Sequence, residues 1–219
     1  MLPFLTENYG NPSSQHELGE RAREAMNNAR TQLAHELGCK AHEIIFTSGG
    51  TEANNLALIG VLRASKKKKI VISAIEHSSV WESAELLRKE GREVQEVSVS
   101  KEGFIRMNEL NNAIDEKTAL VSIIHANNEI GTLQDLRLIG ALCKKKGTLF
   151  HTDAVQSFGK ERINIRDMNI DLLTASAHKI HGPKGVGLLF VREGVPLKQL
   201  IIGGGQEAGG DPARPGAAR

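Results

Sequence analysis

The chain of 219 residues has only two cysteines, Cys39 and Cys143, which lie far apart in the sequence. Two separated cysteines form neither a disulfide framework nor a metal-ligand pattern, and this scarcity is typical of a reducing cytoplasm. The histidines do not complete a zinc site, because the pair His178 and His181 has no Cys pair or Glu nearby. We therefore expect a cytoplasmic protein without a bound metal.

The chain also lacks a long apolar run, a strong net charge and the layout of a signal peptide. No stretch is long and apolar enough to cross a bilayer, and residues 1–5 show no charged leader region. The formal net charge is +2, and its one dense basic block, residues 66–69, is most simply a solvated loop. We expect neither a membrane nor a nucleic-acid partner.

What is present is an ordinary globular composition, 40% hydrophobic and 25% charged, in which short apolar runs alternate with helical patterns. Strands are predicted at 44–47, 70–74, 94–99, 120–124, 148–152, 172–175 and 186–191. Helices are predicted at 18–37, 51–63, 80–89, 107–114 and 135–146, with stops at Gly38 and Gly147. This alternation predicts βαβ units and an α/β fold with a largely parallel sheet. Residues 203–219 contain few large apolar side chains, which predicts a mobile tail.

Polar groups follow five of the predicted strands, at the ends where open α/β sheets bind ligands. These groups are residues 48–52, 76–77, 127–129, 153–156 and 176–181. The first reads Ser-Gly-Gly-Thr-Glu, in which glycines and a helix N-terminus offer backbone amides to a phosphate. Taken alone, this segment is better explained as a tight turn with Thr51 as the helix N-cap. It is not a Walker motif, because no Gly-Lys-Ser or Gly-Lys-Thr follows.

Three further residues suggest chemistry at these strand ends. Asp153 ends an apolar strand, where a carboxylate needs a partner such as a protonated pyridine nitrogen, unless it caps the next segment. Lys179 stands just past a strand, between polar residues and a Gly-Pro turn. A lysine that forms a Schiff base must lose its proton, which requires burial or nearby positive charge; a surface lysine is the alternative. His77 is either a structural residue or a partner for a stacked ring.

Together these segments resemble the cysteine desulfurases, within the class V aminotransferase branch of fold-type I enzymes that use pyridoxal 5'-phosphate (PLP). The matching segments are residues 9–14, 46–55, 76–77, 127–131, 153–156 and 176–185. The resemblance implies a three-layer α/β/α sandwich with a mostly parallel sheet, the large domain of a PLP-dependent transferase. Residues 1–202 would form this PLP-binding domain in part, residues 203–219 a Gly/Ala/Pro-rich tail, and the C-terminal small domain would be absent.

The resemblance also implies a role for each matching residue. Lys179 would hold PLP covalently, Asp153 would keep its pyridine nitrogen protonated, and His77 would stack on the ring and transfer protons. The phosphate would be bound by Gly50, Thr51, Ser176 and His178. The phenolic oxygen of the ring would be contacted by Asn128 and Gln156.

In this family PLP labilises L-cysteine, and a nucleophilic cysteine takes its sulfur, which leaves alanine and a persulfide for iron–sulfur clusters or thiolated tRNA. We therefore expect PLP, L-cysteine, a homodimer and a sulfur-acceptor or scaffold protein. The family's persulfide cysteine and carboxylate-binding arginine lie downstream, and neither Cys39 nor Cys143 matches that cysteine. The family's Arg-Pro-Gly-Thr segment reads Arg-Pro-Gly-Ala at 214–217. Alternatives are a selenocysteine lyase, another class V aminotransferase, and a non-catalytic remnant or interaction module.

Overall fold

The computed structural model describes residues 1–203, which contain one seven-stranded sheet with the order β1-β7-β6-β5-β4-β2-β3. Its strands are β1 Ile44–Thr47, β2 Lys69–Ser73, β3 Glu93–Val97, β4 Thr118–Ser122, β5 Leu149–Asp153, β6 Leu172–Ser176 and β7 Gly187–Val191. Pairs from β3 through β6 are parallel, whereas β7 runs antiparallel to both β6 and β1. The predicted, mostly parallel α/β sheet is confirmed.

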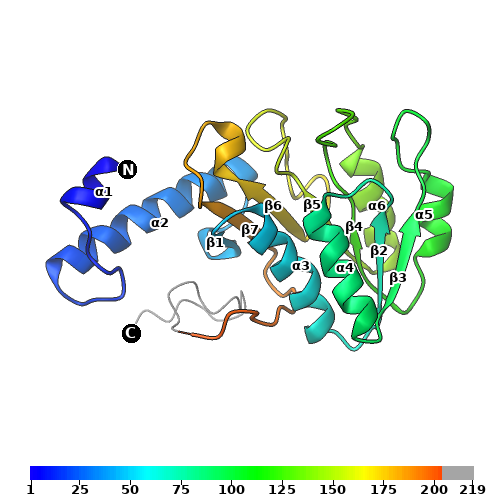
Figure 1. Cartoon of the computed structure of the whole chain (residues 1–219), viewed down its shortest axis with the longest axis horizontal. Coiled ribbons are helices and arrows are strands. Elements are labelled where there is room, and N and C mark those ends of the chain that lie inside the picture. Colours follow the sequence, from blue (N-terminus) through cyan, green and yellow to red (C-terminus); the bar gives the residue numbers. More distant parts are fainter. Residues whose placement is uncertain (204–219) are drawn as a thin grey trace.

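Helices cover both faces of this sheet and give the predicted three layers (Figure 1). The helices are α1 Leu2–Thr6, α2 Glu17–Leu37, α3 Gly50–Ala64, α4 Ser78–Lys89, α5 Met107–Ala113 and α6 Leu136–Lys146, with the short 3₁₀ turns η1 Ala41–Glu43 and η2 Ala177–Ile180. Helices α3 and α4 pack on one face, and α5, α6 and the end of α2 pack on the other. Among residues 1–203, no helix combines the length and the apolar content that a bilayer crossing requires.

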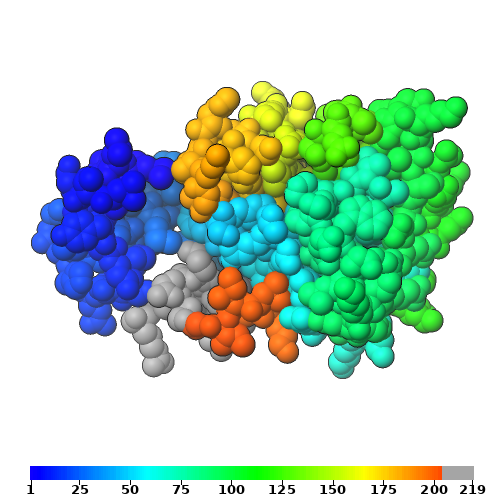
Figure 2. Space-filling view, viewed as in Figure 1, coloured from blue at the N-terminus to red at the C-terminus, as the bar shows by residue number. Residues whose placement is uncertain are grey.

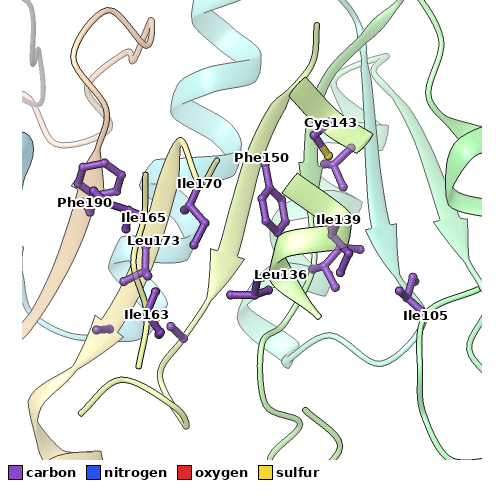
Figure 3. Packing of buried hydrophobic residues seen from close by; sticks show 14 of the residues in the cluster. Ile105, Leu136, Ile139, Cys143, Phe150, Ile163, Ile165, Ile170, Leu173 and Phe190 are labelled. Atoms are coloured by element: carbon purple, nitrogen blue, oxygen red, sulfur yellow. The ribbon is translucent and has the colours of Figure 1, made fainter. Parts of the chain in front are cut away.

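Neighbouring strand residues pack on opposite faces, as the two-residue period of a strand requires. Ile70 and Ile72 of β2 pack with α3 and α4, whereas Val71 between them packs with α5 and α6. Figure 3 shows the cluster of buried side chains on the face covered by α5 and α6. In it, Phe150 of β5 lies beside three side chains of α6, namely Leu136, Ile139 and Cys143. Each fully buried large side chain of this kind stabilises the fold by about 1.5–3 kcal/mol. These two cores make the sheet a rigid platform.

The predicted helix stops are confirmed at two glycines. Gly38 follows α2 with a φ of 71°, and Gly147 follows α6 with a φ of 65°. Both lie in the left-handed region that only glycine enters at little cost. At its other end α6 is capped by Asp135, whose carboxylate accepts hydrogen bonds from the backbone N–H groups of Arg137 and Leu138.

Some boundaries differ from the prediction for physical reasons. The strand predicted at 120–124 is β4 Thr118–Ser122; the buried Ile123 still donates to the His151 carbonyl of β5, but the Ile124 N–H donates to the Glu76 carboxylate instead of a strand. Residues 1–5, which carry no helix prediction, contribute to α1, a helix with no buried residue. The N-terminal segment with α1 and the first part of α2 stands at one end of the molecule (Figure 2). The predicted tail lies outside the described residues except for Gly203.

Candidate active site

The carboxyl ends of five strands meet at one edge of the sheet, because β1, β2, β4, β5 and β6 all run in the same direction. The loops that follow them enclose a pocket of about 310 Å³. All nine predicted site residues line it: Gly50, Thr51, His77, Asn128, Asp153, Gln156, Ser176, His178 and Lys179. The sequence did not indicate four further lining residues, which are Asn54, Ser79, Ile124 and Val155.

Asp153 forms the buried floor of this pocket as the last residue of β5, with 3% of its surface exposed. Its Oδ1 accepts a hydrogen bond of 2.9 Å from the Val155 N–H, and its Oδ2 accepts one of 2.7 Å from the Asn54 side-chain amide. Burial raises the pKa of Asp153, and these two hydrogen bonds oppose the rise. Within residues 1–203, the structure gives Asp153 no salt bridge to Lys or Arg. A cationic N–H donor in the pocket is the partner that this carboxylate lacks.

The N-terminus of α3 forms one wall of the pocket. The helix begins at Gly50 behind Gly49, which supplies no capping side chain, so the amides of the first turn stay available to an anion. The explanation of Thr51 as an N-cap is therefore wrong, because Thr51 already lies inside the helix. A Cβ on Gly50 would stand 2.7 Å from Val155 Cγ2, so any larger residue would displace the Val155 side chain of the loop after β5.

Two more polar groups, one at the end of β6 and one on η2, face the same wall. Ser176 ends β6, and its Oγ lies 2.8 Å from His178 Nδ1. Both residues line the pocket together with Thr51. A hydroxyl, an imidazole and uncapped helix amides are a donor set suited to a phosphate group.

Lys179 stands on η2, at the rim of the pocket. His181, which ends η2, has a φ of 63°, and a Cβ on Gly182 would stand only 2.8 Å from Ala177 Cβ. The turn after Lys179 is therefore tightly closed. The Lys179 side chain is exposed. A lysine that forms a Schiff base is expected to be buried. Residues 1–203 do not bury Lys179, because the pocket is open to solvent on this side.

His77 serves as the N-cap of α4 and also lines the pocket. Its Nδ1 accepts a hydrogen bond of 3.1 Å from the Ser79 N–H and lies 2.8 Å from Ser79 Oγ. The two explanations of this histidine, structural cap and ring partner, are thus compatible. One ring nitrogen holds the helix start, and the other remains for a ligand.

The loop after β4 presents Asn128 by fixing its neighbour. The Asn127 amide donates to the Ile75 carbonyl over 2.9 Å, and its oxygen accepts from the N–H groups of Glu129 and Ile130. Asn128 is left exposed and lines the pocket, as does the half-buried Gln156. Asn127 therefore stabilises the loop, and Asn128 is free to face the pocket.

Glu76 lies behind the pocket and joins two of its loops. Its Oε1 accepts hydrogen bonds from the Ile124 N–H over 2.7 Å and from the Ser73 hydroxyl, whereas its Oε2 has no partner. Burial raises the pKa of Glu76 to about 8, despite these hydrogen bonds. The residue is therefore mainly a protonated structural tie between β2 and β4 at neutral pH.

Neither cysteine is part of this site. Cys143 packs in the core against α6 neighbours, and Cys39 is half-buried beside the same cluster. Burial raises the pKa of both thiols to about 12, so neither is a ready thiolate. Within residues 1–203, no three His, Cys, Asp or Glu side chains gather as metal ligands would.

Comparison with known proteins identifies the family to which the chain belongs. The class V aminotransferase family matches residues 1–209. A cysteine desulfurase IscS from Clostridium botulinum is 50% identical over 211 residues, which cover 95% of this chain and 53% of the relative. The mitochondrial cysteine desulfurase of Saccharomyces cerevisiae is 48% identical over 214 residues, 95% of this chain and 43% of the relative. The chain thus spans about half the length of these curated relatives.

Solved structures agree in fold. One described as a NifS-like protein matches with a TM-score of 0.92 and 43% identity over 95% of this chain and 58% of that one. Another, described as SspA in complex with cysteine, matches with a TM-score of 0.90 and 40% identity over 94% and 61%.

Proposed function

The chain belongs to the class V aminotransferase family, and from that premise we propose that it is the PLP-binding part of a cysteine desulfurase. Such an enzyme takes sulfur from L-cysteine and leaves L-alanine. One observation carries the proposal: the buried Asp153 carboxylate faces a pocket that also contains Lys179 and the uncapped start of α3. The relatives named cysteine desulfurase, at about half identity, support the same reaction.

The chemistry of the pocket fits PLP at three points. The cofactor has an aldehyde, a pyridine nitrogen and a phosphate, and the pocket offers an amine, a buried carboxylate and a set of N–H and O–H donors. The volume of about 310 Å³ lies at the lower end of the range for small-molecule sites. Asp153 in particular needs a cationic donor, because it is buried without a Lys or Arg partner in the described part of the chain.

Each residue would contribute one physical task to the reaction. PLP, when bound, supplies an electron sink for the pair released at the substrate. Asp153 holds a proton on the pyridine nitrogen, because a buried anion stabilises a neighbouring N–H cation. Lys179 supplies the amine for covalent attachment, and His77 presents its second ring nitrogen to the bound molecule. The amides of α3, with Thr51, Ser176 and His178, bind the phosphate and orient the ring.

Sulfur transfer needs a thiolate that this chain does not supply. The sequence has only two cysteines, and burial raises the pKa of both thiols to about 12. We therefore expect the chain alone to bind PLP and L-cysteine without forming a persulfide. A homodimer, a sulfur acceptor and a cytoplasmic location are parts of the same proposal, although some relatives carry mitochondrial or mitosomal names.

The first test is the absorbance of the purified chain after incubation with PLP. We expect a yellow band that Lys179→Ala abolishes and the neighbouring control Lys184→Ala, also exposed, retains. Without any band in the unaltered chain, the non-catalytic remnant becomes the better explanation.

A second measurement separates the enzyme classes. L-cysteine should change the spectrum, whereas sulfide should not be released. Release of sulfide by the chain alone would contradict the missing thiolate. A response to selenocysteine and none to cysteine would favour the lyase alternative.

A further inference from the structure

Two buried side chains that have no role in the proposal above, Asn54 and Ser79, connect Asp153 with His77. Asn54 is 1% exposed and Ser79 is 6% exposed, and both line the pocket. The Asn54 Nδ2 lies 2.7 Å from Asp153 Oδ2 and 2.8 Å from Ser79 Oγ, and Ser79 Oγ lies 2.8 Å from His77 Nδ1. Four side chains, from β5, α3, α4 and the N-cap of α4, thus form one continuous hydrogen-bonded chain.

The direction of each hydrogen bond follows from the chemistry of the groups. An ionised carboxylate only accepts, so the Asn54 amide must turn its NH₂ toward Asp153, and its second N–H then reaches Ser79. The Ser79 hydroxyl, which accepts from Asn54, keeps its single proton for His77 Nδ1. The opposite orientation of the amide would place two oxygens 2.7 Å apart.

An independent contact fixes the same end of the chain. The backbone N–H of Ser79 donates to His77 Nδ1 over 3.1 Å, and a backbone N–H cannot accept. Nδ1 is therefore an acceptor, and the proton of the neutral ring is on Nε2. His77 begins with a proton at Nε2 and can donate it to a ligand, whereas it cannot accept another at that atom.

The orientation of Asn54 has a cost that a purely structural role does not explain. Its Oδ1 is buried and has no hydrogen-bond partner in the described structure. Buried amide oxygens are almost always paired, so an unpaired one indicates that the NH₂ contacts decide the orientation. The side chain stays where it serves Asp153 and Ser79.

We propose that Asn54 and Ser79 are positioning residues that orient the Asp153 carboxylate and place the His77 proton on Nε2. The proposal rests on the proposed PLP site, because it assigns the residue that would hold the ring nitrogen and the histidine that would stack on the ring to a single network. In this arrangement Asn54 influences the tautomer of His77 through Ser79, without contacting the histidine itself.

The test is the tautomer of His77, read by ¹⁵N nuclear magnetic resonance of the histidine-labelled chain without PLP. We expect the Nε2–H form in the unaltered chain. Ser79→Ala removes one of two donors to Nδ1 and should raise the ratio of the Nδ1–H form to the Nε2–H form about threefold to tenfold. Ser79→Thr keeps the hydroxyl and should restore the original ratio. Ser83→Ala, a buried serine of the same helix, is the matched control.

Asn54→Ala tests the longer connection. It should shift the His77 tautomer in the same direction and also weaken PLP binding about tenfold, whereas Asn55→Ala on the same helix should do neither. An unchanged tautomer in both Ser79→Ala and Asn54→Ala, or an Nδ1–H form in the unaltered chain, would overturn the inference. If Asn54→Ala does not fold, the comparison of Ser79→Ala with Ser79→Thr still tests the inference.

The two proposals fail differently. A chain that shows the expected tautomer shifts but never binds PLP would leave the network intact and remove the proposed function. A chain that binds PLP through Lys179 with a tautomer insensitive to Asn54 and Ser79 would do the reverse.

Discussion

At the scale of single residues, Asp153 and Glu76 show how burial assigns two carboxylates different tasks. Asp153 faces the pocket and accepts two hydrogen bonds from protein donors. Glu76 lies behind it and leaves one oxygen without a partner, and burial raises its pKa to about 8. Two buried carboxylates close together disfavour each other's charge, so one of them is best kept protonated.

The protonation of Glu76 predicts a pH-dependent stability. Its pKa is raised from an ordinary value of 4.5 to about 8, so the folded chain binds the proton more tightly than the unfolded chain. The resulting stabilisation is fully present below pH 4.5 and is lost as the pH rises through about 8. Glu76→Gln should flatten this profile and exceed the unaltered chain in stability at alkaline pH by on the order of 5 kcal/mol.

Urea unfolding at several pH values measures this effect, with the exposed Glu116→Gln as the control for loss of one carboxylate. A variant whose loss of stability relative to the unaltered chain grows as the pH rises would show instead that Glu76 serves as an anion.

Thr51 predicts a change in binding with little change in stability. Its side chain is exposed in the first turn of α3 and lines the pocket. Thr51→Ala should weaken PLP binding by one charge-assisted hydrogen bond, about 1.5–3 kcal/mol, whereas Thr51→Ser should keep most of the affinity. Titration of PLP absorbance checks this. Equal affinity in all three chains would remove Thr51 from the site.

At the scale of elements, the close packing of α6 depends on Gly140, although glycine has a low intrinsic propensity for helices. A Cβ on Gly140 would stand 1.8 Å from the Met168 carbonyl oxygen. Alanine favours a helix by about 1 kcal/mol over glycine, but a backbone overlap of this size requires α6 to move from the sheet. Gly140→Ala should therefore destabilise the chain by about 1–3 kcal/mol in thermal or urea unfolding, with the exposed Lys144→Ala as control. A stabilised variant would show that the helix moves freely.

The elements also show what the sequence could predict. Apolar periodicity and glycine stops placed the strands and most helices, because both record which side chains are buried. The direction of β7 was beyond this reasoning, since alternation in Leu188, Leu189 and Phe190 is the same in either direction. Asn54 was missed because α3 is buried almost all round, so one buried polar residue does not break its pattern. Its spacing of four residues from Gly50 was the available signal.

At the scale of the whole molecule, two cores fix the sheet while the pocket stays open at its edge. The loops after β1, β2, β4, β5 and β6 bring all nine predicted residues to one place, although they range from Gly50 to Lys179 in the sequence. Strand ends could be read from the sequence, but exposure could not. Lys179 is exposed because nothing within residues 1–203 covers η2, and that depends on packing between distant segments.

The order of the strands has a consequence for how the chain acquires its ligand. The pocket draws on both β1, the first strand, and β6, the sixth, which are neighbours of β7 at one side of the sheet. β7 lies between them, and its pairing with both strands holds the start of α3 beside the loop that carries Lys179. Binding would then be coupled to completion of folding, and PLP at a hundred times its dissociation constant would add about 2.7 kcal/mol to stability. If the chain binds PLP as proposed, the cofactor would stabilise only those chains in which β7 is already paired with β1 and β6.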